Sequence, residues 1–214
     1  MQIEIFSDVV CPWCFIGKRR LDRILDSDLG AGLQVAWRAY QLYPDLPAQG
    51  IPRAQFMQAR FGSDAAPAEI YQRVLAEAET VGLELAFERI ETAPNTLDAH
   101  RLLSWAEPFG QQHELAEVLF RSYFQEGRDI GDQRELVGAA ERAGLDGAAA
   151  ARMLAGQDEL DKVRAELALA QSAGVTGVPF FILGGRFAIP GAQPADVMQQ
   201  LIVRARERLA ESAG

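Results

Sequence analysis

This 214-residue chain is short of several features that would each point to a function. It has no long uncharged apolar run of the kind that spans a bilayer, and its start, MQIEIFSD, lacks the basic residues and apolar core of a signal peptide. Basic charge is also scarce: 21 Lys and Arg stand against 30 Asp and Glu, a formal net charge of −9. We therefore expect a cytoplasmic globular protein that binds neither nucleic acid nor an anionic membrane.

Cysteine is scarcer still, because Cys11 and Cys14 are the only two in the chain. A structural disulfide across so short a loop would constrain the unfolded chain very little, and a reducing cytosol disfavours it. A zinc site needs four ligands, and the two histidines, His100 and His113, lie far from the pair at a spacing that fits no zinc module. We expect no metal, and we expect both histidines to be surface or boundary residues of helices.

The residues around the cysteines favour redox chemistry. The segment IEIF alternates like a buried strand, and PWCFIGKRRLDRILDSDLG then has apolar residues at helical spacing as far as Gly30. Cys11 falls at the N-cap of this helix and Pro12 at its first position, where the missing N–H costs nothing. The unpaired N–H groups and the helix dipole favour a thiolate at Cys11. We predict that Cys11 is the nucleophile and that Cys14, one turn later, is the resolving cysteine.

The remaining pattern predicts the scaffold of this site. A second strand is expected in GLQVAWRAYQLYP, ending at Pro44, with a connection to about Pro52. Helices are then expected at about 53–61, 67–82, 95–109, 113–126, 132–143, 147–155 and 158–172. Two further strands joined at Gly184-Gly185 and a helix from about Pro194 to Leu209 complete the chain. The order is β-α-β, a helical block, then β-β-α. It predicts an α/β fold in which residues 1–44 and 174–214 form one domain and residues 45–173 an inserted helical domain.

Three motifs carry a resemblance over nearly the whole chain: SDVVCPWCFIGKRRL, APNTLDAHRLLSWA and GVTGVPFFILGGRFAIPGAQP. In this order they resemble the DsbA-like thiol-disulfide oxidoreductases, and most closely the FrnE-type subgroup. The resemblance implies a thioredoxin fold with a helical insertion and a dithiol–disulfide oxidoreductase or isomerase activity at Cys11 and Cys14, without a bound cofactor. It implies a protein or small molecule with a disulfide or dithiol as substrate, and glutathione as a candidate redox partner.

Four further residues are candidates for substrate binding. Proteins of this fold have a cis proline facing the active site, and Val178-Pro179 matches that position. The sequence itself does not show the isomer, since a proline is also simply allowed at the first residue of a strand. A cis bond would turn the Val178 backbone towards an extended substrate. Pro12 and Trp13, between the cysteines, would add an apolar docking surface.

Three other positions have both a structural and a functional interpretation. Asp8, three residues before the first cysteine, could accept the proton of Cys14, but a simple turn acid is the favoured interpretation. Asn95, with Asp98 three residues later, is expected as a helix N-cap, and the resemblance suggests that it also faces the cleft. The basic run Lys18 to Arg20 is expected on a solvated helix face and is not assigned to the site.

An alternative function comes from the same scaffold. It also resembles kappa-class glutathione transferases and 2-hydroxychromene-2-carboxylate isomerases, in which a serine replaces the first cysteine and glutathione is the working thiol. Both cysteines are present here, and GAQP, from Gly191 to Pro194, lacks the Asp-Arg pair of those enzymes. Exchange is therefore the favoured activity, with a glutathione-dependent transferase or isomerase as the alternative and a peptide-binding holdase as a third possibility. DsbA itself has a histidine where this chain has Trp13, so we expect a less oxidising site.

Overall fold

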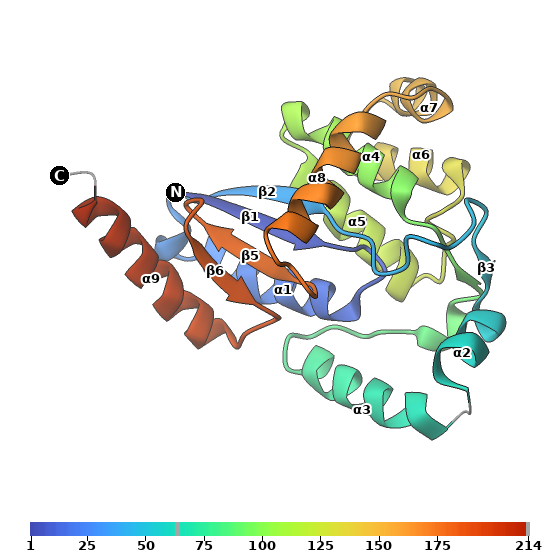
Figure 1. Ribbon diagram of the computed structural model, residues 1–214, viewed down its shortest axis with the longest axis horizontal. Coiled ribbons are helices and arrows are strands. Elements are labelled where there is room, and N and C mark those ends of the chain that lie inside the picture. Colours follow the sequence, from blue (N-terminus) through green and yellow to red (C-terminus); the bar gives the residue numbers. More distant parts are fainter. Residues whose placement is uncertain (63–64, 213–214) are drawn as a thin grey trace.

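The computed structural model describes residues 1–62 and 65–212 (Figure 1). Its main sheet has the strand order β2-β1-β5-β6. β1 (Gln2–Ser7) pairs in parallel with β2 (Gln34–Ala39) and antiparallel with β5 (Phe180–Leu183), which in turn pairs antiparallel with β6 (Phe187–Pro190). Strands from the two ends of the chain therefore share one sheet, and the predicted order of β-α-β, helices and β-β-α is confirmed.

Helices cover both faces of this sheet. α1 (Pro12–Leu25) packs on one face and contacts α9 (Ala195–Glu211), which lies beside β6, while α8 (Leu160–Ser172) packs against β2 on the other face (Figure 1). The alternation of β1 accounts for this arrangement, because Ile5 packs in the core that contains α1 while Phe6 packs with residues at the end of α8. The sheet is thus buried on both sides.

The helices between β2 and β5 occur where the sequence predicts them, with ends that differ by a few residues. They are α2 (Arg53–Phe61), α3 (Ala65–Glu79), α4 (Leu97–Ala106), α5 (Gln112–Phe124), α6 (Gln133–Arg142), α7 (Gly147–Ala155) and α8. Short 3₁₀ turns are present at Asp28–Gly30, Phe87–Arg89 and Glu107–Phe109. Within residues 1–62 and 65–212, none of these helices combines the length and apolarity needed to cross a bilayer.

Two predicted boundaries are wrong. The first helix ends at Leu25 rather than Gly30, because the N–H of Asp26 closes the last turn and the chain then forms the 3₁₀ turn. The second strand ends at Ala39 rather than Pro44. There the backbone leaves the sheet, since the Leu42 N–H donates to the Asp8 carboxylate at 2.8 Å instead of to a strand.

A second, very small sheet was not predicted. β3 (Ile51–Pro52) pairs antiparallel with β4 (Thr92–Ala93). The pairing closes a loop of chain that contains α2 and α3, and these two helices lie apart from α4 to α8 in Figure 1. α3 contacts α1, so this closed loop is held beside the helix that carries the cysteines.

Candidate active site

The two cysteines lie at the start of α1, as the sequence predicts. Cys11 is the N-cap, with extended backbone angles of φ −92° and ψ 112°, and Pro12 is the first helical residue. The Cys11 N–H donates to the Asp8 carbonyl at 2.9 Å, and the Cys14 N–H donates to the Cys11 carbonyl at 3.0 Å. Both thiols are free and both are buried, at 4% and 1% exposure, so Cys11 is less accessible than a nucleophile on an open surface.

The segment before β5 reaches the same point. The Val178-Pro179 bond is cis. The Cys11 thiol donates to the Val178 carbonyl with a sulfur–oxygen distance of 3.5 Å, which joins residues 167 positions apart. Gly17 makes room for this approach, because a Cβ there would lie 3.1 Å from Pro179 Cγ and 3.3 Å from Phe181 Cζ. The four residues Cys11, Gly17, Val178 and Pro179 therefore form one contact surface.

Cys14 lies in a more enclosed setting. Burial raises the pKa of its thiol well above the usual range, and the hydrogen bond to Cys11 and the negative charge of that neighbour raise it further. The Ser7 side chain and the Asp8 backbone act in the opposite direction without reversing the shift. Cys14 therefore keeps its proton at neutral pH. Within the described part of the chain, no group of three or more His, Cys, Asp or Glu residues could hold a metal ion.

Asp8 is more than a turn acid. Its carbonyl accepts the turn hydrogen bond from Cys11, but its side chain is fully buried. One carboxylate oxygen accepts from the Leu42 N–H, and the other lies 3.4 Å from His100 Nε2. Neither this second carboxylate oxygen nor His100 Nε2 makes a hydrogen bond in the described structure.

The two histidines differ from each other in burial. The expected surface or boundary position is wrong for His100, which is 3% exposed because its face of α4 packs inward, and right for His113, whose side chain is 32% exposed.

Asn95 has a different structural role from the expected one. The N-cap of α4 is Thr96, one position later than predicted, and the Asn95 side chain accepts from the Leu97 N–H at 2.9 Å. Its amide donates to the Leu46 carbonyl at 2.6 Å, so it ties the connection after β2 to the start of α4. Its neighbour Pro94 lines the pocket beside the cysteines, and Asn95 does not.

Two of the three basic residues after the cysteines, Lys18 and Arg20, are buried, and Arg19 is half-buried, which contradicts the expected solvated face. The Lys18 side chain is 4% exposed and pairs with Asp22 at 2.9 Å and Glu117 at 3.1 Å. Arg20 pairs with Glu77 on α3. Each buried cation is therefore neutralised by a carboxylate, and these charges brace α1 against α3 and α5 rather than facing the thiols.

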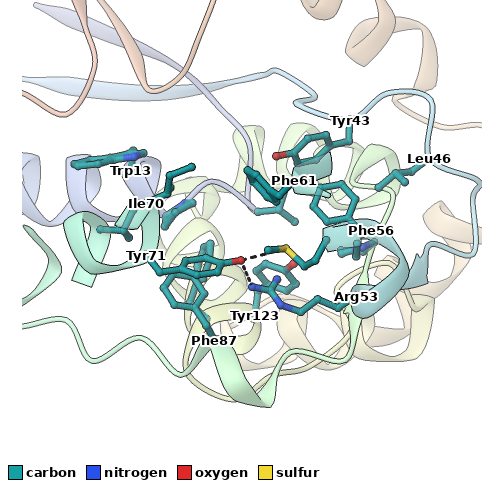
Figure 2. Close-up of a pocket in the computed structure, with 17 residues that line it drawn as sticks. Trp13, Tyr43, Leu46, Arg53, Phe56, Phe61, Ile70, Tyr71, Phe87 and Tyr123 are labelled. Atoms are coloured by element: carbon teal, nitrogen blue, oxygen red, sulfur yellow. Dashed lines mark hydrogen bonds between the residues drawn. The ribbon is translucent and has the colours of Figure 1, made fainter. Parts of the chain in front are cut away.

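Pro12 and Trp13 face an apolar pocket of about 160 Å³ (Figure 2). Val10 completes the wall that comes from the active-site turn. Side chains of α2, α3 and α5 form most of the rest, and Tyr43, Leu46, Phe87, Ala93 and Pro94 also line the pocket. Burial raises the pKa of Tyr43 at the pocket edge; the nearby Arg60 acts in the opposite direction without reversing the shift, and Cys11 and Asp8 add to it. The two predicted docking residues thus lie beside Cys11, on a pocket whose far side the sequence analysis did not identify.

Comparison with known proteins agrees with this geometry. Residues 2–203 match the family described as DSBA-like thioredoxin domain. An uncharacterized protein of Bacillus subtilis, YwbO, is 31% identical over 204 residues, which cover 94% of this chain and 96% of YwbO. The crystal structure of a probable DsbA oxidoreductase from Streptomyces coelicolor is 32% identical and superposes with a TM-score of 0.87, covering 97% of this chain and 90% of that one. A 2-hydroxychromene-2-carboxylate isomerase, 17% identical with a TM-score of 0.72 and full coverage of both chains, shares the fold alone. The chain belongs to the DsbA-like thioredoxin-domain family.

Proposed function

We propose that this protein is a thiol-disulfide oxidoreductase of the FrnE-type subgroup that exchanges dithiol and disulfide through Cys11 and Cys14. One observation carries the proposal. The residue at the N-cap position of α1, Cys11, carries a free thiol that contacts the Val178 carbonyl, and a second free thiol lies one turn inside the same helix. This is the arrangement that an attacking and a resolving sulfur require.

The exchange proceeds in two displacements. The Cys11 thiolate attacks one sulfur of the substrate disulfide, the substrate S–S bond breaks, and a substrate thiolate leaves. Cys14 then gives up its proton and attacks the Cys11 sulfur, which releases the second substrate thiolate. Two electrons have passed to the substrate, and the protein holds a Cys11–Cys14 disulfide. Glutathione is the proposed reductant that restores the dithiol, and the reverse sequence oxidises a dithiol substrate.

The second displacement needs a proton acceptor, because burial keeps Cys14 protonated. We assign this role to Asp8. Its backbone adjoins Cys14, and one of its carboxylate oxygens has no hydrogen-bond partner in the described structure. His100, 3.4 Å from that oxygen, positions the carboxylate from the other side.

The alternative, glutathione-dependent transfer or isomerisation, uses the same fold. Because an oxidoreductase and an isomerase superpose on this chain, the fold does not choose between the two activities. The pair of free thiols favours exchange, since an enzyme in which glutathione is the working thiol has no use for a resolving cysteine one turn away.

An insulin-reduction assay with glutathione as the electron donor tests the proposal. We expect the wild-type protein to exceed the Cys11→Ser/Cys14→Ser double variant by about 10²-fold or more, because intramolecular resolution works at high effective concentration. A parallel assay follows conjugation of glutathione to chlorodinitrobenzene. Conjugation that survives in the double variant, together with absent insulin reduction, would replace exchange by the transferase activity.

A further inference from the structure

The pocket beside Trp13 is small for a ligand site and has a defined capacity. Its volume is about 160 Å³, and an apolar cavity of about 150 Å³ accommodates one benzene ring. Its walls are mostly aromatic and aliphatic, with Phe56 and Phe61 from α2 and with Ile70 from α3, which lies beside Trp13 (Figure 2). The space therefore suits a single ring rather than a peptide segment or a large ligand.

One cation, Arg53, lines this apolar pocket and has no acidic partner among the residues that the structure describes. Arg53 donates to the Tyr71 hydroxyl at 2.6 Å, and its guanidinium stacks near the rings of Tyr71 and Phe87, 5.7 Å and 5.8 Å from their centroids. It makes no ion pair with any Asp or Glu in residues 1–62 and 65–212. Arg53 is the one charged side chain among the described residues that line the pocket, while Arg60 and Arg73 stack on the lining rings of Phe61 and Trp13. In a protein of net charge −9, Arg53 leaves a place for an anion that the described part of the chain does not fill.

A second polar group faces the same space. Tyr123 on α5 is 4% exposed and lines the pocket, and its hydroxyl has no hydrogen-bond partner among the described residues. Burial raises the pKa of Tyr123 well above its usual range, so the hydroxyl keeps its proton and can donate. The Tyr71 hydroxyl, by contrast, is already engaged by Arg53 and by Met57 Sδ at 3.3 Å. Figure 2 shows the Arg53 and Tyr123 side chains converging from α2 and α5.

We propose that this pocket selects the substrate, and that the substrate is a small disulfide or thiol built on an aromatic ring with a carboxylate. The ring fills the apolar space beside Trp13, the carboxylate lies between Arg53 and Tyr123, and the sulfur points towards Cys11. An apolar pocket with a few convergent polar groups is the usual form of a small-molecule site. The inference rests on the proposed exchange, because the pocket borders Pro12 and Trp13 between the two cysteines.

A kinetic experiment with the reduced protein distinguishes recognition of the substrate's carboxylate from recognition of its aromatic ring. The probes are bis(carboxynitrophenyl) disulfide, neutral dipyridyl disulfide and glutathione disulfide. Each aryl probe takes two electrons from the Cys11–Cys14 dithiol and is released as two aryl thiols. We expect Arg53→Gln to slow the carboxylate probe about tenfold, the usual loss for one charge-assisted contact, and to leave the dipyridyl rate within about twofold. Tyr123→Phe should have a smaller effect in the same direction.

Arg164→Gln on the exposed face of α8 is the matched control. It removes the same charge from a side chain that is 64% exposed, so it should leave both rates unchanged. Equal slowing of both probes by Arg53→Gln would mean a damaged fold and would overturn the assignment. An unchanged carboxylate rate, or faster reaction with glutathione disulfide than with either aryl probe, would overturn it as well.

A binding measurement makes the test independent of the thiols. Calorimetric titration of the Cys11→Ser/Cys14→Ser variant with nitrobenzoate should give binding that Arg53→Gln weakens about tenfold. If nitrobenzoate binds in this way but no probe is reduced by the wild-type protein, the exchange function fails and the pocket assignment stands. If the probes are reduced normally but nitrobenzoate does not bind, the pocket assignment fails and exchange stands.

Discussion

Two polar regions adjoin the active-site turn, and they differ in how their polar groups are paired. We call the first the polar floor; it consists of Ser7, Asp8, Cys14 and His100. The second is the pocket around Arg53, Tyr71 and Tyr123. The floor is enclosed by core side chains and adjoins the sulfurs, whereas the pocket is open, aromatic and centred on a cation with no acidic partner among the described residues. The floor is arranged to handle protons, and the pocket is arranged to receive a ligand.

Among the predicted losses of stability, the largest is expected for a substitution in the polar floor. Asp8→Ala should lower the free energy of unfolding by about 1–3 kcal/mol, because it leaves the buried Leu42 N–H without an acceptor. Asp8→Asn retains an oxygen for that N–H and should cost less, while slowing release of a mixed disulfide because the amide cannot take the Cys14 proton. Urea unfolding and single-turnover kinetics measure the two effects. If the two variants were equally stable and equally fast, Asp8 would have neither role.

A smaller effect is expected on the pH dependence of stability. Burial, reinforced by Cys11, raises the pKa of Cys14 in the folded protein. The unfolded thiol loses its proton near pH 8.5 while the folded one keeps it, so this contribution to stability is complete below that pH and is lost above it. The reduced wild-type protein should therefore lose about 1 kcal/mol of stability between pH 7.5 and 9.5 relative to Cys14→Ala. Parallel curves for the two proteins would show that Cys14 is not shielded.

The smallest predicted loss of stability is expected for a substitution in the pocket. Tyr71→Phe removes the hydroxyl that joins Arg53 to Met57, and it should lower the free energy of unfolding by about 1 kcal/mol or less, because the pocket is open to water. The comparison with Asp8→Ala measures the contrast directly, since each variant removes one hydrogen-bonding group. A Tyr71→Phe loss as large as that of Asp8→Ala would mean that the pocket is part of the structural core.

Local sequence rules account for the active-site turn above the polar floor. Cys11 at the N-cap and Pro12 at the first helical position follow from the residues themselves, because capping depends on a few neighbours in the chain. The approach of Val178 to Cys11 spans 167 positions, so only the resemblance to a known fold could suggest it. The burial of Lys18 was missed for a similar reason, since it depends on Glu117 from a distant helix.

The pocket could not be predicted from the sequence. Arg53 and Tyr123 are unremarkable helix residues when each is considered alone, and they meet only because α2 and α5 converge on the active-site turn. His100 is a parallel case, because helical spacing does not say which face of α4 packs inward. In both regions the missing information was the tertiary placement of a helix, not its existence or type.

The central claim is that Cys11 attacks and Cys14 resolves, and trapping of mixed disulfides tests it most directly. Each single serine variant is incubated with an excess of a disulfide substrate, and covalent adducts are counted by intact mass with and without reductant. The account predicts that Cys14→Ser accumulates a reductant-sensitive adduct on Cys11, because its attacking thiolate survives without a resolver. Cys11→Ser should form few adducts, because the remaining thiol is buried and protonated. Adducts that accumulate in Cys11→Ser instead, or in neither variant, would contradict it.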